Sequence, residues 1–186
     1  ALWPRNRLFA REERLLRVEE ERLERFSDRT LMISDAEAAL LRSRLRDPAS
    51  ARIEVVGNGV DFAAFDPTGI APQPELAATP GPHFVFTGQM DYPPNVAAVE
   101  RFARSILPRI RQTHLAAQFH IVGRAPTAAV RALDIETGVR VWGEVAAVQP
   151  FLAAADIVVA PLTIARGTQN KVLEAMAMAR PVLLTP

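Results

Sequence analysis

The chain has 186 residues, of which 49% are hydrophobic and 23% charged, as in an ordinary globular protein. Its net charge of +1 gives no electrostatic reason to expect nucleic acid as a partner. Cysteine is absent, which excludes disulfides and thiolate metal sites, and the three histidines lack metal-site spacing.

The first 65 residues are expected to mix helices and strands. Ser34 with Glu37 forms a capping box, which marks the start of a helix that runs to about residue 46. Residues 66–82 are dense in Pro and Ala without periodicity, and they predict an interdomain linker. The elements predicted before it are a charged helix over 6–26, a strand over 30–33, a helix to about residue 46 and a strand over 53–56.

Residues 83–186 alternate cleanly between short apolar strands and helices. The predicted strands are 84–87, 118–122, 139–142, 157–160 and 182–184. The predicted helices are 95–111, 127–133, 148–154 and 168–178. This pattern predicts an α/β fold with a parallel sheet covered on both faces, doubly wound in the strand order 3-2-1-4-5.

In such a sheet a ligand binds beyond the carboxyl ends of the first and fourth strands. The first strand ends at Gly88, and the segment from Ala165 to Val182 follows the fourth. That segment opens a helix with Lys171, the only lysine of the chain. Because helix starts favour anions, Lys171 and two arginines predict a phosphate site, with glycine N–H groups also approaching the phosphate. The predicted cations are Arg124, Arg166 and Lys171.

The kind of phosphate ligand follows from what is present and what is missing. Gly88 does not open a G-x-G-x-x-G sequence, which disfavours a dinucleotide, and there is no P-loop. Glu174 lies three residues after Lys171 and therefore on the same helical face. A carboxylate there can accept two hydrogen bonds from the vicinal diol of a ribose. A nucleotide-sugar fits these groups better than a nucleoside triphosphate.

Several strings also resemble a known family. The chain resembles glycosyltransferase family 4, which has the GT-B fold, in Asn58-Gly-Val-Asp61, Val122-Gly-Arg124, Asn170-Lys-Val-Leu-Glu-Ala-Met-Ala177 and Arg180-Pro-Val182. It is similar to a bacterial branch, the sugar transferases of exosortase and exopolysaccharide systems, in Phe86-Thr-Gly-Gln-Met-Asp-Tyr-Pro-Pro-Asn95 and Ala165-Arg-Gly-Thr-Gln-Asn170.

The resemblance implies retaining transfer of a sugar from a nucleoside-diphosphate sugar to a glycan or lipid-linked acceptor, without metal or cofactor. It implies that residues 1–65 end an acceptor-side domain and that residues 83–186 bind the donor. Glu174 would hold the ribose, and Val141 and Trp142 would lie near the base. The diphosphate would be bound by Gly88, Arg124, Arg166, Gly167, Thr168 and Lys171.

Three positions depart from the family pattern. The first glutamate of its E-x7-E motif is replaced by Arg166, and the arginine after the first-strand glycine is replaced by Gln89. Asn95 stands where the family pattern has a lysine, and we interpret it as a helix N-cap. We hypothesise that Arg166 supplies the positive charge that this loop lacks.

Two other functions stay open: a nucleotide-sugar epimerase of the same fold, and a non-catalytic nucleotide-binding or scaffold module. The resemblance implies a bacterial cytoplasmic enzyme, with peripheral contact at the inner membrane left open. We expect no membrane-spanning helix and no signal peptide. The chain is also expected to be an inactive fragment, truncated at its C-terminus, whose catalytic base and acceptor site lie upstream.

Overall fold

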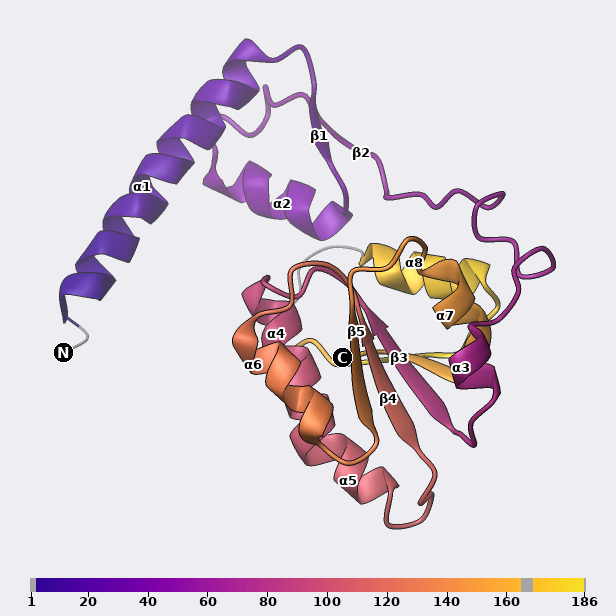
Figure 1. The fold of residues 1–186 in the computed structure, drawn as a ribbon. Helices are drawn as coiled ribbons and strands as arrows, with labels where there is room; N and C mark the ends of the chain where they lie inside the picture. The colour runs from indigo at the N-terminus through magenta and orange to yellow at the C-terminus, as the bar shows by residue number, and fades with distance from the viewer. Residues whose placement is uncertain (1–2, 165–168, 186) are drawn as a thin grey trace. The chain divides into compact units, whose positions relative to one another are not determined.

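The computed structural model describes residues 3–164 and 169–185, and their side chains from residue 6 onward. The chain divides into two compact units, Ala1–Asn58 and Gly59–Pro186 (Figure 1). No helix of the described part is long and apolar enough to span a membrane.

The first unit contains α1 (Trp3–Phe26), β1 (Thr30–Met32), α2 (Asp35–Arg44) and β2 (Ile53–Val55). The predicted N-cap is confirmed, because the Ser34 hydroxyl accepts a hydrogen bond from the Glu37 N–H at 3.3 Å. The two short strands pair in parallel, and the small core beneath them contains Ala38, Leu41 and Ile53. The Glu24 carboxylate accepts from the Arg52 N–H at 2.9 Å and ties α1 to this core.

The second unit is built on a five-stranded parallel sheet in the order β5-β4-β3-β6-β7. The strands are β3 (His83–Thr87), β4 (Gln118–Val122), β5 (Val139–Gly143), β6 (Ile157–Ala160) and β7 (Val182–Leu184). In chain order this is 3-2-1-4-5, which confirms the predicted doubly wound sheet.

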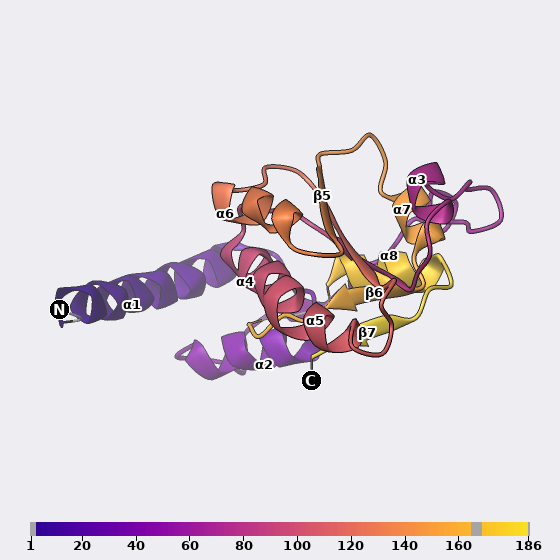
Figure 2. The same cartoon turned by 60° about the horizontal axis from the view of Figure 1, so that its bottom comes forward.

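Helices cover both faces of this sheet (Figure 2). One face carries α4 (Pro93–Arg101), the π-helical turn η1 (Phe102–Ile106), α5 (Leu107–Ile110), α6 (Ala128–Arg131) and the 3₁₀ turn η2 (Ala132–Ile135). The other face carries α3 (Pro74–Ala77), α7 (Gln149–Ala154) and α8 (Asn170–Ala177).

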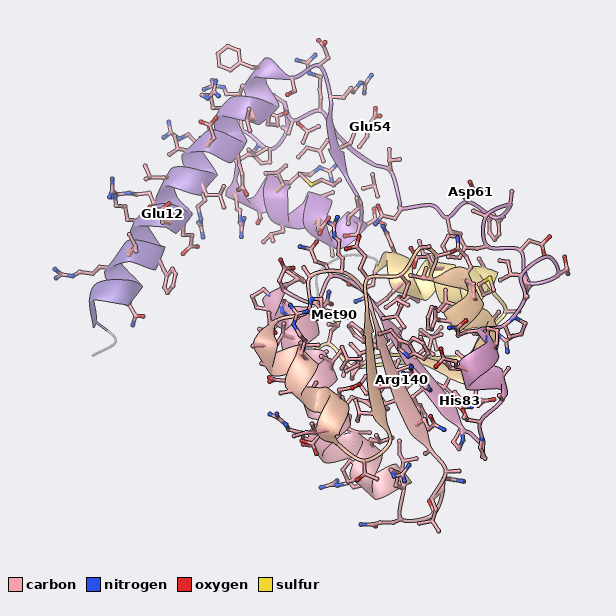
Figure 3. The ribbon with its side chains drawn as sticks, viewed as in Figure 1. Glu12, Glu54, Asp61, His83, Met90 and Arg140 are labelled. Carbon is pink, nitrogen blue, oxygen red and sulfur yellow. The ribbon has the colours of Figure 1, made fainter. Side chains whose placement is uncertain are left out.

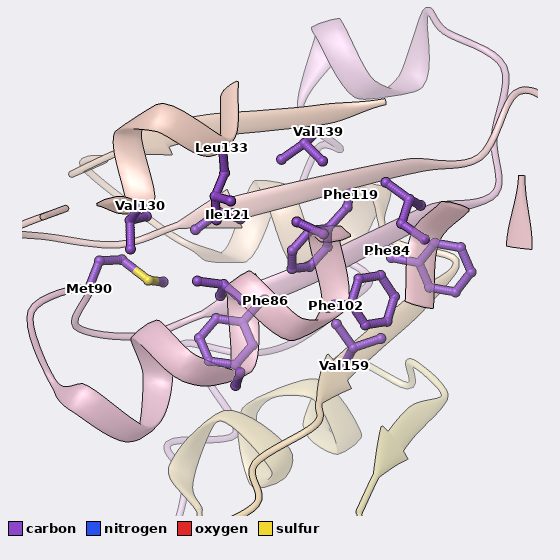
Figure 4. Packing of buried hydrophobic residues seen from close by; sticks show 14 of the residues in the cluster. Phe84, Phe86, Met90, Phe102, Phe119, Ile121, Val130, Leu133, Val139 and Val159 are labelled. Carbon is purple, nitrogen blue, oxygen red and sulfur yellow. The ribbon is translucent and has the colours of Figure 1, made fainter. Parts of the chain in front are cut away.

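Side chains that alternate along the central strands separate the two cores. Phe84 and Phe86 of β3 join the cluster under α4 and α6, where the rings of Phe84, Phe102 and Phe119 lie close together (Figure 4). Val85 points to the opposite face and packs with the cluster under α7 and α8. A strand buried on both faces in this way reads as a continuous apolar run, which is why β3 could be predicted.

The predicted linker does not lie between the two units of the structure. Their boundary falls after Asn58, and residues 66–82 belong to the second unit. Within them α3 buries Leu76, which is 1% exposed, and the Gln73 N–H donates to the Pro150 carbonyl at 2.8 Å. One buried leucine in a proline-rich stretch gives no periodicity from which to predict this packing. The assignment of residues 1–65 to an acceptor-side domain stays a prediction.

The long helix predicted over 95–111 begins earlier and is interrupted. It begins at Pro93, with Tyr92 as the N-cap, so the interpretation of Asn95 as an N-cap is wrong. Prolines suit the first helical position because no partner is needed for an N–H there. The interruption η1 precedes Pro108, which cannot donate to the preceding turn and whose ring crowds the carbonyl four residues before it.

Two histidines and a tryptophan form a buried polar network under α7. The Trp142 indole N–H donates to His120 Nδ1 at 3.2 Å, so the neutral His120 ring carries its proton on Nε2. That nitrogen lies 3.1 Å from His83 Nδ1, and His83 Nε2 lies 3.0 Å from the Thr79 carbonyl. Burial, His83 and Arg140 together lower the pKa of His120 from 6.5 to about 4. The third histidine, His114, is exposed.

We expect the second unit to lose stability in mild acid. A proton binds His120 in the unfolded chain near pH 6.5 but in the folded chain only near pH 4, so the unfolded state binds more protons between these values. Stability is therefore full above pH 6.5 and falls by up to about 3 kcal/mol toward pH 4. Urea denaturation between pH 7 and 5 measures this slope. His120→Gln should flatten it and His114→Gln should keep it; equal slopes in the two variants would contradict the assignment.

A second stability test concerns the end of α8. Ala179 has a φ of 52°, a left-handed conformation that favours glycine. Two hydrogen bonds end the helix there: the Ala179 N–H donates to the Met176 carbonyl, and the Arg180 N–H donates to the Ala175 carbonyl. Ala179→Gly should therefore raise the free energy of unfolding by about 1 kcal/mol. The same change at Ala97, exposed within α4, should lower it by about 1 kcal/mol. Urea denaturation checks both, and losses of equal size would show that no strain exists at Ala179.

Candidate functional site

Glycines lie at the carboxyl ends of β3, β4 and β5, and the middle one, Gly123, contacts both Gly88 and Gly143. The Gly88 N–H donates to the Val122 carbonyl at 3.1 Å, and the Gly123 N–H donates to the Gly143 carbonyl at 2.8 Å. A Cβ on Gly123 would lie 1.6 Å from the Gly88 carbonyl oxygen. The expectation that these glycine amides face a phosphate is therefore wrong, because both N–H groups have backbone partners. The glycines provide space instead.

The loop after β3 is held against the loop after β4. Met90 is fully buried, and its N–H donates to the Arg124 carbonyl at 2.8 Å; Figure 3 shows it beyond the carboxyl end of β3, with His83 at the other end of that strand. The Arg124 guanidinium donates to Gln89 Oε1 at 2.9 Å and is exposed at this edge. Ala125, the next residue, has a φ of 54°, so the backbone beside Arg124 is strained.

Lys171 extends from the first turn of α8 to Gly88, as predicted from the sheet order. Its side chain is only 9% exposed, and Nζ donates to Asn95 Oδ1 at 2.9 Å. Nζ also lies 4.3 Å from the centroid of the Phe86 ring, a cation–π contact. A Cβ added to Gly88 would lie 3.4 Å from Nζ. The lysine and the glycine therefore share one small region at the mouth of the sheet.

This ammonium group is buried, and no described carboxylate lies within ion-pair distance of it. Lys171 takes part in none of the ion pairs formed by the described residues. Burial lowers its pKa from 10.5 to about 8, and the more distant charge of Glu174 opposes this shift. A buried charge without a counter-ion is costly, and an anion bound at this position would offset that cost.

Asn95 is the residue of this site that the sequence interpretation missed. It lies in the first turn of α4, is 6% exposed, and donates from Nδ2 to the Gln89 carbonyl at 2.9 Å while accepting from Lys171. The available signal was its position, since the family pattern has a cation there. The contact with Lys171 could not be predicted from this position, because an Asn near the start of a helix is commonly an N-cap.

Three other residues predicted for the site lie in the described part of the chain: Glu174, Val141 and Trp142. Glu174 is half-buried one turn beyond Lys171, and burial raises the pKa of its carboxyl while Lys171 lowers it. Val141 packs on the core and its N–H donates to Asp134 at 2.7 Å. The Trp142 indole packs on Phe151 at 4.9 Å between ring centroids. Their roles stay predictions.

Arg166, Gly167 and Thr168 lie outside the described residues. Within residues 3–164 and 169–185, no three His, Asp or Glu side chains gather closely enough to hold a metal ion. The predicted independence from metal and cofactor stays a prediction.

Comparison with known proteins identifies the family. The family model described as glycosyl transferases group 1 matches residues 81–186, which is more than half of the chain. The chain belongs to this family. A comparison with curated protein sequences gives no match.

Solved structures show the same fold at low identity. HepE of Anabaena, in complex with UDP-glucose, is 17% identical with a TM-score of 0.66, over 91% of this chain and 48% of that one. Sucrose-phosphate synthase of Thermosynechococcus elongatus is 20% identical with a TM-score of 0.65, over 93% and 44%. A glycosyltransferase of Rickettsia africae is 14% identical with a TM-score of 0.64, over 89% and 47%.

These likenesses confirm an α/β fold of GT-B type, as predicted. This chain of the group 1 glycosyltransferase family spans about half the length of the solved structures that it matches.

The contact between Gly123 and Gly88 allows a direct test of how the ends of β3 and β4 pack. Gly123→Ala should lower the free energy of unfolding by about 3 kcal/mol or more, because the added Cβ meets the backbone of Gly88 rather than a flexible side chain. Gly69→Ala, with no atom within 4 Å of its new Cβ, should change stability by less than about 0.5 kcal/mol. Urea denaturation compares the two, and a similar small effect in both would contradict the packing.

Proposed function

We propose that this chain carries the donor-binding part of a glycosyltransferase that uses a nucleoside-diphosphate sugar. The observation that carries the proposal is the Lys171 ammonium, which is nine-tenths buried, lies next to Gly88 and forms no ion pair with a carboxylate in the part of the chain that the structure describes. It stands at the carboxyl edge of a doubly wound sheet, where such folds bind their ligands. Family membership and the UDP-glucose named for the HepE structure support the same ligand class.

The site contains groups suited to the diphosphate, the ribose and the base of such a donor. Lys171 and Arg124 offer positive charge to the diphosphate, which gains negative charge as the sugar departs. Gly88 leaves room for that group because it has no side chain in front of Lys171. Glu174, one turn along α8, offers a carboxylate to the two hydroxyl groups of the ribose. The base would lie toward Val141 and Trp142.

The finer features of the function follow from the family resemblance. We propose a retaining transfer without metal, to a glycan or lipid-linked acceptor in cell-surface polysaccharide synthesis, by a bacterial cytoplasmic enzyme of glycosyltransferase family 4. Arg166 is proposed to add charge at the diphosphate. The acceptor site and the catalytic base are proposed to lie outside this chain, so that it binds the donor without turning it over.

Removal of the buried charge tests the proposal. Isothermal titration calorimetry at pH 7 should detect binding of UDP or another nucleoside diphosphate among ADP, GDP and dTDP. Lys171→Met, which keeps the length of the side chain, should weaken that binding at least tenfold, about 1.4 kcal/mol, because a charge-assisted contact is lost.

The matched control is Arg109→Met, which removes one positive charge from α5, the helix that leads to the opposite end of the sheet. It should leave the affinity within twofold. The proposed function would be contradicted if the protein bound none of the four diphosphates, or if the two variants lost affinity to the same extent.

A further inference from the structure

Asn95 contacts Lys171 directly and is linked to Arg124 through Gln89. Its Oδ1 accepts from Lys171 Nζ at 2.9 Å, and its Nδ2 donates to the Gln89 backbone carbonyl at 2.9 Å. The side chain of the same Gln89 accepts from Arg124 at 2.9 Å. Lys171, Asn95, Gln89 and Arg124 therefore form a continuous series of contacts that joins α8, α4 and the exits of β3 and β4.

The two hydrogen bonds of Asn95 fix which way its amide points. Nδ2 can only donate and the Gln89 carbonyl can only accept, so Oδ1 must face Lys171. Asn95 is 6% exposed, and its Nδ2 would lie 2.9 Å from a Cβ on Gly88. The amide therefore holds the lysine in place next to the glycine.

An amide acceptor differs from a carboxylate in what it leaves available. A carboxylate in this place would form a buried ion pair with Lys171, and the net charge facing a ligand would be close to zero. The neutral amide satisfies one of the three ammonium donors and adds no negative charge of its own, so the more distant Glu174 is the carboxylate that acts on Lys171. The Phe86 ring below the ammonium adds an attraction without adding negative charge.

We propose that Asn95 is a positioning residue that holds the Lys171 ammonium at Gly88 without neutralising it, and so keeps its charge available to the diphosphate of the donor. This inference rests on the proposed function. It predicts that the charge of the side chain at position 95, rather than its shape, decides the affinity for the diphosphate.

Asn95→Asp is the decisive variant, because it adds a negative charge and keeps the size of the side chain. It also removes the Nδ2 donor to the Gln89 carbonyl. At pH 7 the affinity for UDP, or for the nucleoside diphosphate that the protein binds best, should fall at least tenfold. The melting temperature should fall little, because the new ion pair with Lys171 offsets the loss of the hydrogen bond that Nδ2 donates to the Gln89 carbonyl. Asn6→Asp, exposed on α1, is the matched control and should leave the affinity within twofold.

Lys171 can be observed on its own, because it is the only lysine of the chain. In protein labelled with ¹³C-lysine, its Cε resonance should titrate near pH 8 in the unaltered chain, since burial lowers the pKa of Lys171 to about 8. In Asn95→Asp the midpoint should rise by about one pH unit or more, because an adjacent carboxylate favours the charged form. Among the described residues, the other charged groups near the site are Glu174 on α8, Arg124 after β4 and Asp91 in the loop after β3. These groups and the proposed Arg166 are unchanged in the variant.

Asn95→Leu provides a second test that is independent of the aspartate. It removes the acceptor, so the lysine midpoint should fall below that of the unaltered chain, and the affinity should fall more at pH 8 than at pH 7. If Asn95 were purely structural, the midpoint of the Lys171 titration would be unchanged in both variants.

Unchanged affinity in Asn95→Asp, or an unchanged lysine midpoint in either variant, would overturn this inference. The proposed function would then still stand as long as Lys171→Met loses binding. If the unaltered chain binds no nucleoside diphosphate, the proposed function itself fails, and the lysine titrations still report whether Asn95 controls Lys171.

Discussion

The site depends on one buried ammonium group. Lys171 is 9% exposed, contacts a neutral amide and an aromatic ring, and has no carboxylate partner among the described residues. Burial lowers the stability of the charged form, and it therefore lowers the pKa of Lys171. A fold keeps an unfavourable charge of this kind where a ligand compensates it, which is why perturbed groups gather at functional sites.

The parallel sheet explains why these groups meet although 76 residues separate Asn95 from Lys171 along the chain. Each crossover helix begins just beyond the carboxyl end of the strand before it. Here β3 leads into α4 on one face, and β6 leads toward α8 on the other. Because β3 and β6 are neighbours, the first turns of the two helices lie on either side of the β3 exit, and a lysine from one reaches an asparagine from the other.

The sequence predicted the parts of this arrangement that depend on the pattern of apolar residues and on the order of the strands. The apolar runs of β3, β4 and β6 gave the sheet, and the sheet order placed Lys171 beside Gly88. It did not predict Asn95, because a residue in the first turn of a helix reads as a cap unless its distant partner is known. Nor did it show that the Gly88 and Gly123 amides are occupied, because this depends on how closely neighbouring strand exits pack.

The departures from the family pattern acquire a common physical meaning in the structure. In glycosyltransferase family 4, which the chain resembles, the loop after the first strand carries an arginine and is followed by a lysine, whereas here the corresponding residues are Gln89 and Asn95. Each of these amides accepts a hydrogen bond from a cation that another element supplies: Gln89 from Arg124 after β4, and Asn95 from Lys171 on α8. An amide in place of a cation removes one charge but adds an acceptor that can orient another. In this chain, the described cations at the mouth of the sheet therefore come from the exit of β4 and from α8.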